Sequence, residues 1–146
     1  MKKPRCSNFW SSVAGTAAIE FAFLAMPFLG VTTAALEAGR AAWTLEALQD
    51  SATQGARCIG VQSSSCYSAG AFSTASAVAH IQNVAAGWGV TIPASAITTT
   101  QSTSCGSVAG FAAVQISYSF SSIAGSLIPA LNNVPLSASA CFPTNT

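Results

Sequence analysis

An apolar stretch of 24 residues, Val13–Leu36, constrains the fold of this chain more than any other feature of its sequence. It contains a single charged residue, Glu20. A bilayer core about 30 Å thick requires roughly 20 helical residues, so the stretch is long enough to span a membrane. Three basic residues lie within the first five positions, and the next one is Arg40. This charge asymmetry predicts a cytoplasmic N-terminus and an exported C-terminal part.

The helical sequence continues past the end of the apolar stretch. Residues 36–50 are mostly good helix formers and include no proline, which predicts one long helix. Leu36, Trp43 and Ala47 can share one stripe of this helix, with Leu45 and Leu48 beside it. The continuation argues against a cleavable secretory signal ending at residues 33–35, and so does the charge of Glu20. A plain single-pass anchor is the other alternative.

The spacing of Gly15 and Glu20 indicates a processing site. A carboxylate inside a membrane span is costly and marks a functional site by default. Gly15 and Glu20 enclose the residues TAAI, between a short basic leader and the apolar span. This arrangement resembles the type IV prepilin motif, which implies cleavage between Gly15 and Thr16 by a membrane aspartyl peptidase. In an assembly, Glu20 would then pair with the new α-ammonium group of a neighbouring subunit, because both charges need a partner in an apolar core.

The resemblance extends beyond pilins in general. The sequence from Gly15 to Arg57 is similar to the opening of TadE-like proteins, the pseudopilins of tight-adherence (Flp-type) pili. The segments that carry the likeness are AAIEFAFLAMP (17–27), EAGR (37–40), LEALQDSA (45–52) and GAR (55–57). The resemblance implies a non-enzymatic minor pseudopilin that helps to assemble an adhesive pilus. It also implies as partners the prepilin peptidase, the major Flp-type pilin, other minor pseudopilins and the inner-membrane assembly platform.

Four regions are expected on this basis. They are a basic leader (1–15), the transmembrane part of the N-terminal helix (16–36), an exported helical stalk (37–57) and an exported Ser/Thr-rich domain (58–146). The protein is expected to cross the inner (cytoplasmic) membrane once, with its C-terminal domain in the periplasm or in a pilus at the cell surface.

The cysteines fit an exported domain. Cys6 lies in the leader, and the four others form an even set that an oxidising compartment would pair. Three connectivities are possible for Cys58, Cys66, Cys105 and Cys141. We favour Cys58–Cys66, which closes a short Ser-rich loop, and Cys105–Cys141, which ties a strand region to the C-terminus. No Cys-x-x-Cys spacing or nearby histidines indicate a metal site.

The exported domain is expected to be α+β and pilin-like, with a second helix and a small antiparallel sheet. The second helix is predicted over residues 68–86, with Phe72, Ala75, Val78, Ala79 and Gln82 near one face, and it should end at Gly87-Trp88-Gly89. Strands are predicted over residues 90–92, 96–100, 112–120 and 134–141, with residues 121–133 as a long loop. Pro135 argues for an edge position of the last strand or for the start of that strand.

Charge and composition exclude several function classes. Only 6% of the residues are charged. The segment from Cys58 to Thr146 contains no Asp, Glu, Lys or Arg. Without a basic patch, nucleic-acid binding is excluded. His80 is the only histidine and has no acidic residue in its own domain to orient it, so no catalytic residue, metal or cofactor is predicted. Trp10 and Trp43 flank the span and are expected at membrane edges or in a core.

The uncharged Ser/Thr-rich surface has two explanations: it keeps an exported protein soluble, or it favours association between copies by removing like-charge repulsion. We favour the second, because the pilin-like N-terminus already implies assembly. The leading interpretation is therefore a minor pseudopilin. The alternative is a membrane-anchored or secreted binding domain in the periplasm or at the surface, unrelated to a fibre. An anchored hydrolase is the third interpretation and has the least support.

Overall fold

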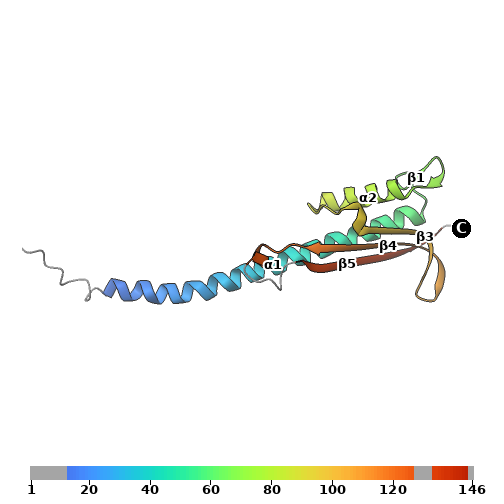
Figure 1. Ribbon diagram of the computed structural model, residues 1–146. Coiled ribbons are helices and arrows are strands. Elements are labelled where there is room, and N and C mark those ends of the chain that lie inside the picture. Colours follow the sequence, from blue (N-terminus) through green and yellow to red (C-terminus); the bar gives the residue numbers. More distant parts are fainter. Residues whose placement is uncertain (1–12, 127–132, 145–146) are drawn as a thin grey trace, which may run out of the picture. The chain divides into compact units, whose positions relative to one another are not determined.

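The computed structural model describes residues 13–126 and 133–144. The chain divides into two compact units, Met1–Ala38 and Gly39–Thr146. In chain order the elements are α1 (Val13–Gly60), β1 (Tyr67–Ser68), β2 (Ala71–Phe72), α2 (Thr74–Gly87), the 3-10 helix η1 (Ala94–Ala96), β3 (Ile97–Cys105), β4 (Val108–Phe120), the 3-10 helix η2 (Ile123–Ser126) and β5 (Val134–Pro143) (Figure 1). This α+β, pilin-like arrangement of a long apolar helix, a second helix and small antiparallel sheets confirms the predicted fold class.

The helix α1 has 48 residues and includes Pro27 in its interior. Its end is marked by Gln62, whose φ of 56° is left-handed, and the amide of Val61 donates to the carbonyl of Arg57 at 2.9 Å. A left-handed residue just beyond the last turn is a common way to end a helix and to satisfy its last carbonyls. The predicted long helix is therefore present, and it extends ten residues past Asp50.

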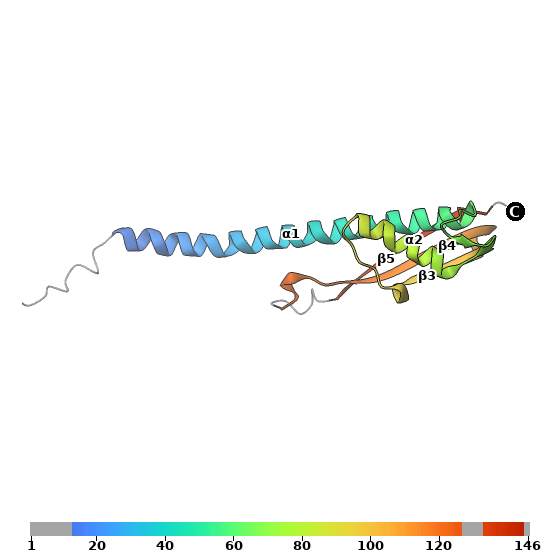
Figure 2. The ribbon, with the colours of Figure 1, turned by 90° about the horizontal axis from the view of Figure 1, so that it is seen from above.

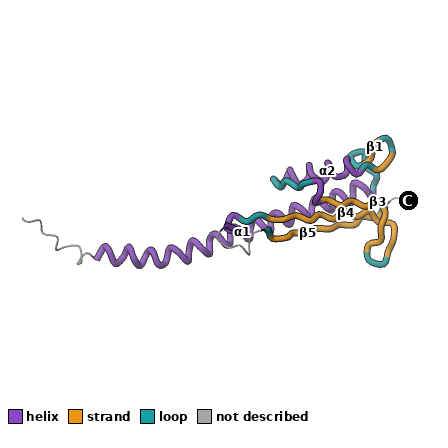
Figure 3. Tube along the Cα trace, in the orientation of Figure 1, coloured by secondary structure: helices purple, strands orange, loops and turns teal. Residues whose placement is uncertain are grey.

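The second unit has two layers, with helices on one face of a three-stranded antiparallel sheet. The strand order is β3-β4-β5, so β4 is central and β5 is an edge strand, as Pro135 indicates. Figure 2 shows α2 beside the C-terminal part of α1, and Figure 3 shows the three strands side by side. The core draws on both layers: Ala47, Leu48, Ala52, Ala56 and Ile59 of α1, Ala77, Ile81 and Ala85 of α2, and Ile97, Ala112, Val114, Ile116 and Ala138 of the sheet.

The buried face of α1 differs from the predicted one. Leu36, Trp43 and Leu45 are exposed, and only Ala47 and Leu48 of the predicted set are buried. The buried stripe consists mostly of small residues at intervals of three and four: Thr44, Ala47, Leu48, Ser51, Ala52, Gly55, Ala56 and Ile59. Small side chains let α2 and the sheet approach the helix axis closely. A search for large apolar residues therefore points to the wrong face of α1.

Gly55 is the closest point of this packing. A Cβ built on Gly55 would lie 2.5 Å from Cγ1 of Ile81 on α2 and 3.4 Å from Cγ2 of Val114 on β4. Ile81 is fully buried and Val114 is almost so. Only glycine therefore fits where α1, α2 and β4 meet.

The second helix begins six residues later than predicted. Residues 67–72 form a short hairpin, β1–β2, with a two-residue turn. The turn residues Ala69 and Gly70 have φ values of 51° and 81°. Positive φ at both turn residues suits a tight hairpin. Ser73 then caps α2, because its hydroxyl oxygen accepts from the amide of Ser76 at 3.2 Å.

The end of α2 agrees with the prediction, whereas its buried face does not. Gly89 has φ 77°, its amide donates to Ala86, and the amide of Val90 donates to Ala85. This paired pattern is the Schellman motif. The buried face consists of Ala77, Ile81 and Ala85, whereas Ala75 and Ala79 of the predicted face are exposed.

The strand predictions need three corrections. Residues 90–92 do not join a sheet, although Val90 and Ile92 are buried in the core. The carbonyl of Ile92 accepts from the Gln82 side chain at 2.8 Å, so its hydrogen bond is made without a neighbouring strand. The strands β3, β4 and β5 are all longer than predicted, because they pair with one another beyond the segments in which apolar and polar residues alternate. The predicted loop 121–133 contains η2, and residues 127–132 lie outside the described part of the chain.

The β3–β4 hairpin bends near its tip, as the tube in Figure 3 shows. The pairing register shifts between Thr100 and Thr103, and again before Ser104. Such irregularities bend a strand and increase its twist. Cys105 lies at this tip and is bonded to Cys141 on β5, so the hairpin tip of one edge strand is tied to the opposite edge strand.

Candidate functional site

The predicted processing residues lie in the first turns of α1. Gly15, Thr16 and Glu20 are all exposed, and a Cβ on Gly15 would meet nothing within 4 Å. Thr16 and Glu20 are four residues apart, so they are neighbours on one face of the helix. Cleavage after Gly15 would therefore create the α-ammonium group one helical turn from the Glu20 carboxylate.

The helix around these residues is apolar and exposed. Phe21, Phe23, Met26 and Phe28 each expose about 70% of their surface or more, at 72%, 77%, 77% and 69%. A helix that is apolar all round is typical of a membrane span or of a helix that a larger assembly buries. Among the described residues, α1 is the one helix that is long and apolar enough to cross a membrane.

Two threonines of this segment make hydrogen bonds within the helix. The hydroxyl of Thr32 donates to the carbonyl of Phe28, and that of Thr33 donates to the carbonyl of Leu29, both at 2.8 Å. Because hydrocarbon offers no hydrogen-bond partner, such internal bonds allow threonine inside a membrane. Glu20 is thus the one ionisable side chain between Gly15 and Leu36.

The four cysteines of the predicted exported domain form two disulfides. Cys58 is bonded to Cys66, with a Cα–Cα distance of 6.0 Å, and both residues are buried. Cys105 is bonded to Cys141, with a Cα–Cα distance of 6.5 Å. These are the two pairs that the sequence analysis favours. Cys6, predicted to stay unpaired, lies outside the described residues, and so does Trp10.

A cluster around Trp88 was not found by sequence reasoning. The indole Nε1–H of Trp88 donates to Oδ2 of Asp50 at 2.9 Å, and the indole Nε1–H of Trp43 donates to the carbonyl of Trp88 at 3.2 Å. The rings of Trp43 and Trp88 lie edge to face with centroids 5.1 Å apart. Trp43 therefore packs on its own domain, and its 45-residue separation from Trp88 left no local signal in the sequence.

The histidine and the acidic residues of the described part of the chain lie on two different helices. His80 lies half-buried on α2, whereas Glu37, Glu46 and Asp50 lie on α1. Across residues 13–126 and 133–144, no three His, Cys, Asp or Glu side chains gather in a way that could hold a metal ion.

Comparison with known proteins gives one match. Residues 15–57 match the model of the family described as TadE-like protein. No curated protein and no solved structure matches the chain. The matched segment contains Gly15, Thr16 and Glu20 and lies wholly within α1. Over this long N-terminal helix the chain is therefore similar to TadE-like proteins.

Proposed function

We propose that this chain is a minor pseudopilin that takes part in the assembly of a tight-adherence pilus and supports adhesion to surfaces. The observation that carries the proposal is the combination of Gly15 and Glu20 on an exposed, apolar helix. A soluble domain gains nothing from such a helix, whereas a membrane-held subunit that later enters a helical bundle needs it. The family match covers the same segment and supports the same conclusion.

The proposed life cycle begins in the inner membrane. The basic leader stays in the cytoplasm, residues 16–36 cross the bilayer, and the remainder of the chain is exported. A prepilin peptidase cuts between Gly15 and Thr16 on the cytoplasmic side. Glycine suits this step because a residue without a side chain lets a protease approach the backbone closely.

Glu20 has its role after cleavage. In an apolar assembly a carboxylate is costly unless it is paired, and so is the new α-ammonium group of Thr16. Because Thr16 and Glu20 are one turn apart on α1, each subunit presents the two charges on one face, about 6 Å apart along the helix axis. Glu20 of one subunit then pairs with the Thr16 ammonium of the next, which sets the register between adjacent helices.

The exported domain provides a surface that suits close lateral packing. The outward-facing residues of β4, among them Gln115, Ser117 and Ser119, are exposed and uncharged. An uncharged surface lets copies approach without repulsion. The proposed partners are the prepilin peptidase, the major Flp-type pilin, other minor pseudopilins and the inner-membrane assembly platform.

Deletion of the gene in its native host tests the proposal. Loss of surface pili and of adherence is expected, with both restored by the wild-type chain supplied in trans. Normal pili and normal adherence in the deletion strain would overturn the pseudopilin assignment and favour a binding domain unrelated to a fibre.

A further inference from the structure

The end of β4 is paired on one side only. The ladder between β3 and β4 ends at the pair Ile97–Ile116, whereas the ladder between β4 and β5 continues to Phe120–Val134. Residues 117–120 of β4 therefore pair with β5 but have no residue of β3 beside them. Over these residues the edge of β4 that faces away from β5 is open.

The register shows which main-chain groups point to this open edge. The amide of Thr144 donates to the carbonyl of Gly110 at 2.9 Å, and from there the pairing of β4 with β5 runs without a shift to the end of β4. Hydrogen-bonded and non-hydrogen-bonded pairs alternate in an antiparallel ladder, so Ser119 and Pro135 form a non-hydrogen-bonded pair. Pro135 has no N–H, which agrees with this assignment. The N–H and C=O of Ser119 thus point away from β5, where no strand of the described chain pairs with them.

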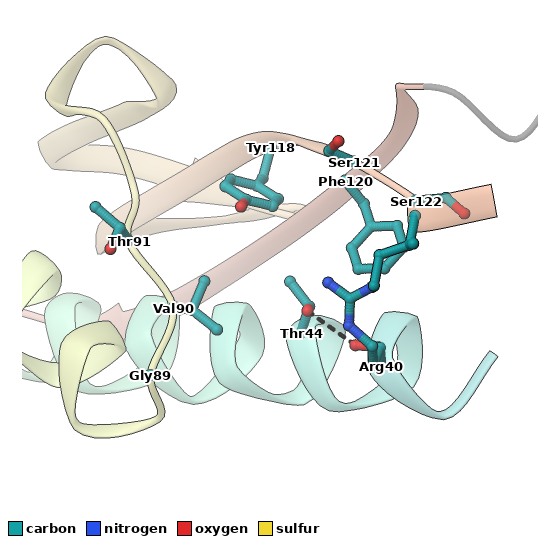
Figure 4. A pocket seen from close by; sticks show the side chains of 10 residues that line it. Arg40, Thr44, Gly89, Val90, Thr91, Tyr118, Phe120, Ser121 and Ser122 are labelled. Atoms are coloured by element: carbon teal, nitrogen blue, oxygen red, sulfur yellow. Dashed lines mark hydrogen bonds between the residues drawn. The ribbon is translucent and has the colours of Figure 1, made fainter. Parts of the chain in front are cut away.

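Two pockets of the unit Gly39–Thr146 lie along this edge. The larger has a volume of about 520 Å³, and the smaller about 340 Å³. The smaller one lies between residues 117–119 of β4 and the segment that follows α2, including Pro93 and Ser95. Tyr118 lines both pockets, so they adjoin each other along the strand. Figure 4 shows the two walls of the larger pocket, with Val90 and Thr91 on the segment after α2 and Tyr118 and Phe120 on β4.

The side chains of β4 alternate between the two faces at this point. Ser117 and Ser119 are exposed, whereas Tyr118 is half-buried and Phe120 is buried. The Phe120 ring is held by Arg40, whose guanidinium carbon lies 5.4 Å from the ring centroid. A strand added beside β4 would therefore direct every second side chain toward the larger pocket, on the face of Tyr118 and Phe120.

The outer edge of β5 is protected in a way that the open edge of β4 is not. The carbonyl of Ser139 accepts from the side-chain amide of Gln49 on α1 at 3.2 Å, and β5 contains Pro135 and Pro143. Prolines and covering side chains are common means of blocking a sheet edge. The edge at Ser119 has neither of these on its own strand and has pockets instead.

The two walls define what can fill this space. Because the segment with Pro93 and Ser95 closes the far side, a single extended segment fits there better than the edge of a second sheet. No residue from Cys58 onward is charged, so the segments after α2 and along β4 offer an incoming chain no ion pair. The chemistry therefore favours an uncharged extended peptide with a large apolar side chain for the larger pocket.

We propose that an uncharged extended segment of a partner protein adds to the sheet here, pairing with the N–H and C=O of Ser119 and placing one apolar side chain in the larger pocket. Main-chain hydrogen bonds supply affinity in this mode of recognition, and pockets for alternate side chains supply specificity. The inference concerns the unit Gly39–Thr146 alone, and it requires neither cleavage after Gly15 nor a pilus.

The test uses the full ¹⁵N-labelled chain in detergent micelles, titrated with the blocked pentapeptide STLTS and followed by NMR. Without peptide, the Ser119 amide should exchange rapidly with water, whereas the Tyr118 amide, which points to β5, should be protected. Saturating peptide should slow the exchange of Ser119 about tenfold or more and leave Tyr118 unchanged. The peptide SPLPS keeps the leucine but lacks the two N–H donors that flank it, so it should bind about tenfold more weakly.

Two substitutions at one position separate the backbone from the side chain. Ser119→Ala removes only the hydroxyl and should bind STLTS like the wild type. Ser119→Pro removes the N–H and should bind about tenfold more weakly. Equal affinities of these two variants would overturn the proposal.

A second pair of variants keeps the test decisive if Ser119→Pro does not fold, which circular dichroism establishes. Ser121 lines the larger pocket, so Ser121→Trp should fill it and weaken binding about tenfold. Ser137→Trp is the matched control, because Ser137 is exposed on β5 and lines neither pocket. Equal binding by these two tryptophan variants would contradict a pocket-bound side chain.

The exchange of the free protein provides the last check. Protection of the Ser119 amide without peptide at every protein concentration would show that the chain itself fills the edge, and the proposal would be wrong. Protection that grows with protein concentration would assign the site to a second copy of this chain and would equally overturn a foreign segment. Neither result touches the pseudopilin proposal, because the deletion experiment measures pili independently.

Discussion

The indole N–H of Trp88 donates a 2.9 Å hydrogen bond to the carboxylate of Asp50, across 38 residues of sequence. The same Oδ2 atom accepts from the side-chain amide of Gln54, also at 2.9 Å. Trp88 is the residue that ends α2, and Asp50 lies on α1. This bond therefore locks the C-terminal end of α2 against the helix that carries the family motif.

Replacing Trp88 by phenylalanine removes this donor and keeps an aromatic ring. We expect Trp88→Phe to lower the free energy of unfolding by about 1.5 kcal/mol, because hydrogen bonds to charged groups contribute at that level. Trp43→Phe is the matched control. It removes a 3.2 Å bond to an uncharged carbonyl from a ring that is 57% exposed, so it should cost less. Urea unfolding followed by far-UV circular dichroism measures both, and equal losses would refute the ranking.

Two glycines of α1 should respond to alanine in opposite directions. Gly55→Ala places a methyl group 2.5 Å from Cγ1 of the buried Ile81, and overpacking of this kind costs about 1–3 kcal/mol. Gly39→Ala meets nothing within 4 Å, so the gain in helix propensity of up to about 1 kcal/mol should dominate. Thermal unfolding distinguishes the two variants. A stabilised Gly55→Ala protein would contradict the close packing of α1, α2 and β4.

The disulfide between Cys105 and Cys141 should contribute more to stability than the one between Cys58 and Cys66. It closes a segment of 36 residues, compared with 8 for the other. On the chain-entropy account, Cys105→Ser with Cys141→Ser should lower the free energy of unfolding by about 3–4 kcal/mol. Peptide mapping of the unreduced protein should recover both links. Free thiols at these four positions would contradict the prediction.

Processing is expected to leave 131 residues with Thr16 at the N-terminus. A bulky residue at the cut site blocks the approach of the peptidase, so Gly15→Leu should accumulate as full-length precursor. Edman sequencing of protein from the native membrane, with Gly30→Leu as a glycine control away from the site, checks this. A mature terminus near Leu36 would identify a signal-peptidase product and contradict the pilin interpretation.

Glu20 is expected to act in assembly and not in processing. Glu20→Gln and Glu20→Ala should both be cleaved normally and stay in the membrane, because removing a carboxylate makes the span more apolar. Both should reduce piliation, since the Thr16 ammonium of a neighbour loses its partner. Counts of surface pili and the adherence of cells measure this. Full piliation by both cleaved variants would show that Glu20 has no such role.

Local patterns predicted the elements whose formation depends on local forces. The continuous α1 follows from helix propensity and from the absence of proline in residues 36–50. Gly89 marks the end of α2, because a left-handed residue completes that cap. The alternation of apolar and polar residues in β4 and β5 likewise predicted strands that half-bury one face. The candidate processing site stays a prediction, which rests on the sequence spacing of Gly15 and Glu20.

The tertiary structure decided which faces are buried and which distant residues meet. The large apolar residues Leu36 and Trp43 suggested one face of α1, but the packed face contains Ala47, Ala52 and Gly55, because close approach by the sheet selects for small side chains. The Trp88–Asp50 bond has no local signal, since it joins two residues that are 38 positions apart. Backbone periodicity specifies elements, whereas these contacts depend on how the elements pack, and packing is a property of the whole domain.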